Sequence, residues 1–137
     1  MEHWRDCREK GDVMSGEKCR ILVVDDDPFV VEMLAIILEA DGYEVDTAEN
    51  GEDALAKFTA SPDTGLIISD MNMPGMTGLE LISQIRAYNS SIPAILLTGS
   101  DDVDPGQEVD EYLLKDENIQ DNISLSVERV LERHAQV

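Results

Sequence analysis

Five short apolar runs divide most of this chain, and each is followed by a turn or by a segment with helical spacing. The first run, at residues 21–24, is rich in β-branched residues, and short runs bounded by turn residues are typical of buried strands. The later runs lie at 43–48, 66–69, 94–97 and 112–114. Because strands that alternate with helices form parallel sheets covered on both faces, the chain is predicted to be an α/β protein with a doubly wound five-stranded parallel sheet.

The segments between these runs carry the signals of helices. Asp27 can cap a helix that begins with Pro28 and ends at Gly42. Apolar residues recur within it at helical spacing. Similar patterns predict three further helices, at about 51–58, 78–88 and 119–131.

The chain is strongly acidic, with a net charge of −20 over 137 residues. Residues 1–18 hold four basic and five acidic residues, and residues 19–137 hold six basic and 25 acidic residues. Nucleic acids and anionic membrane surfaces are bound through lysine and arginine, so this composition argues against both. It favours binding of a cation and association with basic partner surfaces.

One domain is expected, at residues 19–137. Residues 1–18 lack sustained apolar periodicity and are predicted to be a disordered N-terminal extension, with Met14 as an alternative natural start. No stretch is long and apolar enough to span a membrane, and no signal-peptide core precedes the domain, so a cytoplasmic location is expected. The two cysteines are too few for a disulfide scaffold.

Polar residues follow four of the five predicted strands. Asp25 and Asp26 follow the first strand, and Asp70 follows the third. Thr98 follows the fourth strand and Lys115 the fifth. Ligands bind at the carboxyl ends of parallel strands, where these side chains are expected to meet. Three crowded carboxylates repel one another, and Mg²⁺, which prefers oxygen ligands, would relieve that repulsion.

Five motifs can be recognised, and four of them include these strand ends. They are ILVVDDDP at 21–28, ENGEDAL at 49–55, LIISDMNMPGMTGLELI at 66–82, ILLTGS at 95–100 and YLLKD at 112–116. Together they resemble the receiver domain of two-component response regulators over roughly residues 19–134. The resemblance implies a flavodoxin-like receiver fold and a phosphoprotein of phosphorelay signal transduction.

Matched position by position, the resemblance assigns the acceptor and the metal ligands. Asp70 is implied to be the phosphorylation site and the catalytic nucleophile. Mg²⁺ is implied to be bound by Asp25, Asp26 and Asp70, and by the backbone carbonyl of Asn72.

Thr98 and Lys115 complete the implied catalytic set. Thr98 donates its hydroxyl to the phosphoryl group, while Lys115 pairs with Asp70 before transfer and with the phosphoryl group afterwards. Thr98 and Tyr112 also match the family's switch pair, in which the aromatic ring rotates as the threonine moves inward. Gly99 matches the small residue that keeps the pocket open.

Two departures from the family pattern follow the fourth predicted strand. Asp116 follows Lys115 where family members usually have proline, and a non-proline cis bond costs about 3 kcal/mol, so a trans bond is expected. Residues 101–110 are fewer than usual, hold only two apolar residues and contain Pro105-Gly106, which disfavours a helix. The fourth helix is therefore predicted to be shortened or absent.

The expected function is that of a single-domain response regulator. It would accept a phosphoryl group from a sensor histidine kinase or a phosphotransfer protein and signal through changed contacts with an unidentified downstream protein. It would not be an enzyme beyond catalysing its own phosphorylation and dephosphorylation. Neither nucleic acid nor membrane is expected among its partners.

Three alternatives stay open. The chain could be a receiver-like interaction module that is not phosphorylated, or the receiver fragment of a longer regulator. A Mg²⁺-dependent hydrolase with an aspartyl-phosphate intermediate ranks last. Such enzymes typically carry a second aspartate two residues after the nucleophile, where this chain has Asn72.

Overall fold

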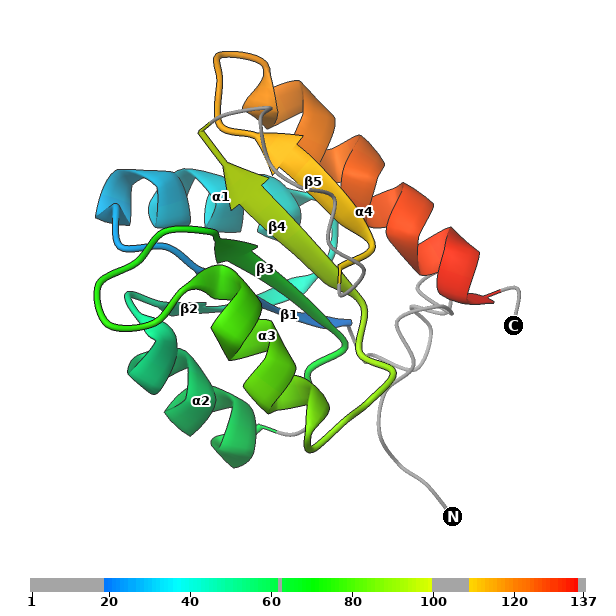
Figure 1. Ribbon diagram of the computed structural model, residues 1–137. Coiled ribbons are helices and arrows are strands. Elements are labelled where there is room, and N and C mark those ends of the chain that lie inside the picture. Colours follow the sequence, from blue (N-terminus) through cyan, green and yellow to red (C-terminus); the bar gives the residue numbers. More distant parts are fainter. Residues whose placement is uncertain (1–18, 62, 100–108, 136–137) are drawn as a thin grey trace.

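The computed structural model describes residues 19–61, 63–99 and 109–135, with side chains described up to residue 132. Strands and helices alternate from β1 to β4 as predicted, and β5 and α4 follow (Figure 1). In chain order they are β1 Arg20–Val24, α1 Pro28–Ala40, β2 Glu44–Ala48, α2 Gly51–Ala60, β3 Leu66–Asp70, α3 Gly78–Arg86, β4 Ala94–Thr98, β5 Glu111–Leu114 and α4 Ile119–Ala135.

The five strands form one parallel sheet in the order β2-β1-β3-β4-β5. Figure 1 shows α1 and α4 on one face of the sheet and α2 and α3 on the other. This arrangement confirms the predicted doubly wound, flavodoxin-like fold.

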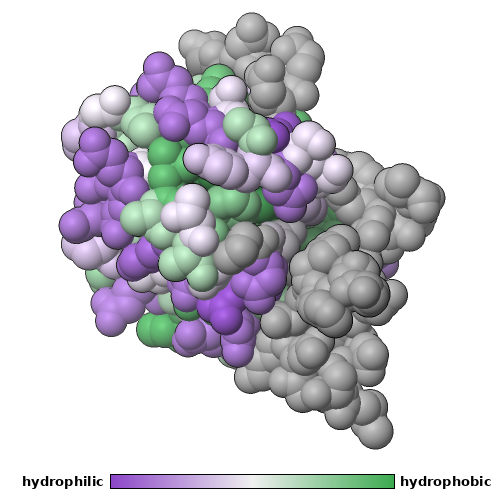
Figure 2. Space-filling view, turned by 90° about the horizontal axis from the view of Figure 1, so that it is seen from below, coloured by the Kyte–Doolittle hydropathy of each residue, from purple (hydrophilic) through white to green (hydrophobic). Residues whose placement is uncertain are grey.

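The inner strand β1 packs into a separate apolar cluster on each face. Ile21 and Val23 belong to the cluster beneath α1 and α4, whereas Leu22 and Val24 belong to the cluster beneath α2 and α3. Successive strand residues point to opposite faces, so a strand that is apolar at every position must be covered on both sides. The molecular face seen in Figure 2 is mainly hydrophilic around a smaller apolar area.

Side-chain caps begin α1 and α3 close to strand ends. The Asp27 carboxylate accepts a hydrogen bond from the Phe29 amide at the start of α1. At the start of α3, Thr77 and Glu80 each accept a hydrogen bond from the other's backbone amide, at 3.1 and 2.9 Å. These caps satisfy amides that would otherwise lack partners, and they define where each helix leaves its loop.

The start of β5 is tied to the helices on both faces. The Asp110 carboxylate accepts a hydrogen bond from the Ala94 amide at 2.9 Å and lies 3.6 Å from the Arg86 guanidinium of α3. Glu111 accepts two hydrogen bonds from Arg129 of α4, at 2.6 and 2.8 Å. These contacts fix the strand whose other end leads into the site.

Some sequence predictions fall on segments outside the described residues. They are the N-terminal extension at 1–18 and residues 101–108 of the segment predicted to lack a full helix. Val109 and Asp110, which precede β5, are not helical. The peptide bond between Lys115 and Asp116 is trans, as expected. Within the described ranges, no helix is long and apolar enough to cross a membrane.

Gly78, the first residue of α3, allows this helix to approach the end of β3. A Cβ atom at this position would collide with the backbone carbonyl of Asp70 and lie 2.8 Å from Cδ1 of Leu96. The Gly78 amide donates a hydrogen bond to the Met71 carbonyl at 2.9 Å. The backbone beside Asp70 therefore depends on a residue without a side chain.

We expect Gly78→Ala to lower the free energy of unfolding by about 1–3 kcal/mol, because backbone atoms cannot move aside as a flexible side chain can. Gly99→Ala is the matched control, since a Cβ atom at Gly99 meets nothing within 4 Å and should change stability by less than about 0.5 kcal/mol. Urea denaturation of the two variants measures the difference. Equal effects would contradict the steric argument.

Candidate functional site

The ends of four neighbouring strands bring the predicted site residues to one edge of the sheet. Val24, the last residue of β1, pairs with Ser69, so Asp25 follows it beside Asp70 of β3. On the other side, Thr98 of β4 pairs with Leu114 of β5, so that Lys115 follows next to Thr98. The expected convergence at the carboxyl edge is confirmed.

Three carboxylates lie close together at this edge. Asp25, Asp26 and Asp70 each offer one oxygen atom, and these atoms lie within 4.8 Å of one another. Asp25 is fully buried and Asp70 is 5% exposed, whereas Asp26 is exposed to solvent. The cluster is therefore enclosed on the sheet side and open at Asp26.

The Lys115 ammonium lies between two of the three carboxylates. Its Nζ atom is 2.9 Å from Oδ2 of Asp25 and 3.3 Å from Oδ1 of Asp70. The resemblance implied the pairing with Asp70, and the structure adds a shorter contact to Asp25. Three carboxylates and one ammonium leave two negative charges.

Burial raises the pKa of the Asp25 carboxyl, and the charge of Asp70 adds to the effect, although Lys115 and the Asp27 amide oppose it. Burial alone would lower the pKa of Lys115. Hydrogen bonds to Asp25 and Asp70 and their charges outweigh burial and raise that pKa. Lys115 is therefore stabilised in its charged form, whereas burial and the charge of Asp70 disfavour the ionised form of Asp25.

A divalent cation fits this donor set. Oδ1 of Asp25 accepts a hydrogen bond from the Asp27 amide at 2.9 Å, and the buried Oδ2 lies 2.9 Å from the Lys115 ammonium. Oxygen ligands and two uncompensated negative charges suit Mg²⁺. Asn72 lies on the exposed loop two residues beyond Asp70, and the role of its carbonyl stays a prediction.

The predicted switch residues lie next to this edge. Thr98 is 4% exposed, and its backbone carbonyl accepts a hydrogen bond from the Lys115 amide at 2.8 Å. Tyr112 is half-buried and packs against the apolar cluster beneath α2 and α3. Gly99 is exposed and has open space where a side chain would lie. The hydroxyl contact of Thr98 and the rotation of Tyr112 stay predictions.

Two features of the site were missed by sequence reasoning. The close approach at Gly78 has no distinctive signal in a single sequence, since glycine in a first helical turn has several common causes. The cap formed by Thr77 and Glu80 does have one, because a threonine followed three residues later by glutamate before an apolar run is the capping-box pattern.

Comparisons with known proteins agree with this geometry. The family model of the response regulator receiver domain matches residues 21–123. The chain therefore belongs to the receiver domains of response regulators.

Two relatives illustrate the range of similarity. One is the response regulator TrrA from Thermotoga maritima, whose crystal structure was solved in complex with Mg²⁺-BeF. TrrA is 41% identical in sequence to this chain, and the two structures superpose with a TM-score of 0.74. The match covers 82% of this chain and 98% of the TrrA chain. The alkaline phosphatase synthesis transcriptional regulatory protein PhoP of Bacillus subtilis is 42% identical over 84 residues. That match covers 61% of this chain and 34% of PhoP, so this chain aligns with only about a third of that relative's length.

We expect Asp25→Asn to raise the free energy of unfolding in EDTA by about 1 kcal/mol. The substitution removes a buried charge that repels Asp70, and Lys115 is not left unpaired because it keeps its contact with Asp70. Urea denaturation without divalent cations measures the effect.

Asp27→Asn is the control for this prediction. It removes a neighbouring but exposed carboxylate, and asparagine caps a helix as well as aspartate does. We expect a change within about 0.5 kcal/mol. Destabilisation by Asp25→Asn alone would mean that the ion pair with Lys115 outweighs the cost of burying the carboxylate.

Proposed function

We propose that this receiver domain accepts a phosphoryl group on Asp70 from the phosphohistidine of a sensor histidine kinase or a phosphotransfer protein. The observation that carries this proposal is the buried Asp70 carboxylate, grouped with those of Asp25 and Asp26 and 3.3 Å from the Lys115 ammonium. The phosphorylated state would signal through changed contacts with other proteins.

The chemistry is an in-line transfer between two side chains. An Asp70 carboxylate oxygen attacks phosphorus, the phosphorus–nitrogen bond to histidine breaks, and the histidine nitrogen keeps the electron pair. Mg²⁺ held by Asp25, Asp26, Asp70 and the Asn72 carbonyl would neutralise charge on the phosphoryl oxygens. The protein acts only on its own aspartate, so we do not class it as an enzyme.

Lys115 and Thr98 would stabilise the product. The Lys115 ammonium, already 3.3 Å from Asp70, can pair with the phosphoryl group while it keeps its contact with Asp25. The Thr98 hydroxyl, at the end of the neighbouring strand, would donate a hydrogen bond to a phosphoryl oxygen. Movement of Thr98 toward that oxygen would draw the Tyr112 ring inward.

A related solved structure supports a histidine kinase as the partner. TrrA has also been solved in complex with the histidine kinase ThkA, and that TrrA chain is 43% identical to this one with a TM-score of 0.73. We propose a histidine kinase as the phosphodonor here on this likeness. The net charge of −20 supports a protein partner in preference to nucleic acid or an anionic membrane, and a cytoplasmic location fits that role.

We expect acetyl phosphate with Mg²⁺ to add one phosphoryl group to the wild-type protein and none to Asp70→Asn. Intact-mass spectrometry measures the gain, and Asp27→Asn serves as the control with an intact acceptor. An equal gain in Asp70→Asn would contradict the assignment. No gain in the wild type would favour the alternative of an interaction module that is not phosphorylated.

The same measurement tests the cation requirement. We expect excess EDTA to abolish the mass gain, because the incoming phosphoryl group would meet uncompensated carboxylates. Asp26→Ala should slow the reaction by about tenfold or more. Undiminished phosphorylation in EDTA would contradict the requirement for Mg²⁺.

A further inference from the structure

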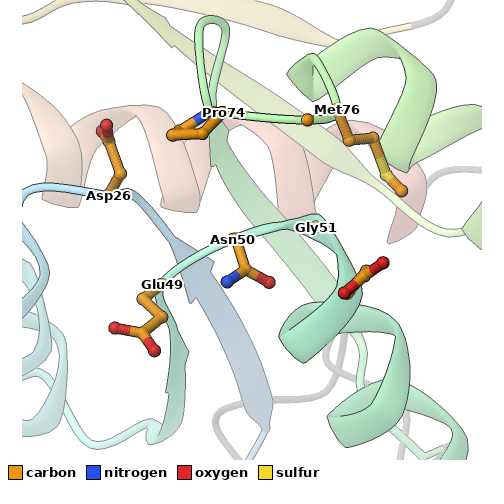
Figure 3. A pocket seen from close by; sticks show the side chains of 8 residues that line it. Asp26, Glu49, Asn50, Gly51, Pro74 and Met76 are labelled. Atoms are coloured by element: carbon orange, nitrogen blue, oxygen red, sulfur yellow. The ribbon is translucent and has the colours of Figure 1, made fainter.

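A groove of about 430 Å³ opens beside the carboxylate cluster. Figure 3 shows it between the turn before α2, which carries Glu49, and the loop after β3, which carries Pro74 and Met76. Asp26 also lines the groove, so the groove adjoins the acceptor edge, meaning the sheet edge that carries Asp25, Asp26 and Asp70. Glu52 of α2 completes the rim of the groove. The groove thus combines apolar side chains with three carboxylates.

The walls of this groove are held in place by close packing. Gly51 is buried, and a Cβ atom there would lie 2.5 Å from the Met76 sulfur, so the start of α2 and Met76 are in close approach. Asn50 caps α2 by accepting a hydrogen bond from the Asp53 amide at 2.7 Å. The shape therefore exists before any partner binds.

The carboxylates of the groove are not neutralised within the described part of the chain. Asp26, Glu49 and Glu52 are exposed, and none of them forms a salt bridge there. Every basic side chain that the structure describes pairs with other carboxylates. These side chains are Arg20, Lys57, Arg86, Lys115 and Arg129. The groove therefore has an open negative potential beside apolar surface.

This combination of apolar surface and carboxylates favours binding of a cationic side chain with an apolar stem over binding of a second metal ion. Among the described residues, Asp25, Asp26 and Asp70 are the only group of three or more whose ligand atoms lie within 4.8 Å of one another, so Glu49 and Glu52 do not add a metal site of that kind. Arginine and lysine lay an apolar stem along apolar surface and place their charge near carboxylates.

We propose that this groove receives an arginine or lysine side chain of the protein that docks at the acceptor edge. The stem would lie along Pro74 and Met76, and the charge would face Glu49 and Glu52. The identity of that protein as the phosphodonor rests on the proposed function. Because Asp26 belongs to both sites, a side chain in the groove would place the donor next to the acceptor.

The test uses the isotope-labelled full chain and a blocked, neutral helical peptide that carries one arginine. A matched peptide carries citrulline, which has the same shape without the charge. In an amide-shift titration at low salt, we expect saturable shifts centred on residues 49–52 and 75–76 with arginine, and none with citrulline. Glu49→Gln/Glu52→Gln should weaken binding about fivefold or more, since two exposed ion pairs are lost.

The control variant is Glu32→Gln/Glu132→Gln, which removes two exposed charges from α1 and α4 and should weaken binding less than about twofold. Shifts centred elsewhere, an equal response to citrulline, or equal weakening by both double variants would overturn the proposal. Acetyl phosphate should modify Glu49→Gln/Glu52→Gln at the wild-type rate. If the wild type is not modified, the proposed function fails, whereas the titration still decides whether the groove binds a basic side chain.

Discussion

The edge of the sheet is organised by the mutual repulsion of Asp25, Asp26 and Asp70. Two of these carboxylates are buried, and burying a charge is costly unless an opposite charge lies close. Lys115 supplies one positive charge to Asp25 and Asp70, and two negative charges remain. Under the proposed function, the same crowding would favour a divalent cation at this edge and, through that cation, a phosphoryl group.

The rest of the fold holds these charges together against their repulsion. Strands β1, β3, β4 and β5 are neighbours in one parallel sheet, and β1, β3 and β4 are buried from both faces, so the strand ends cannot separate without exposing the core. The close approach at Gly78 fixes the backbone beside Asp70, and the contacts of Asp110 and Glu111 fix β5. Placing a reactive group on rigid elements is what phosphoryl transfer requires, because most of its catalysis is positioning and electrostatics.

Apolar periodicity and strand-end residues were enough to predict the described strands and helices and the convergence of Asp70 and Lys115. They could not predict the contact between Lys115 and Asp25, because a strand end places a Cα atom but not the tip of a four-carbon side chain. Nor could they predict the groove, since its walls come from three separate loops. The open negative groove beside the carboxylate cluster is seen only once the three loops are placed together.

A crystal structure of the full chain with Mg²⁺ and beryllium fluoride, an analogue of the phosphoryl group, would test the central claim most directly. The account predicts beryllium bonded to an Asp70 carboxylate oxygen, with one Mg²⁺ held at the edge formed by Asp25, Asp26 and Asp70, and with Lys115 against a fluorine atom. Beryllium fluoride on another carboxylate, or an Asp70 adduct with no metal at these three residues, would contradict it.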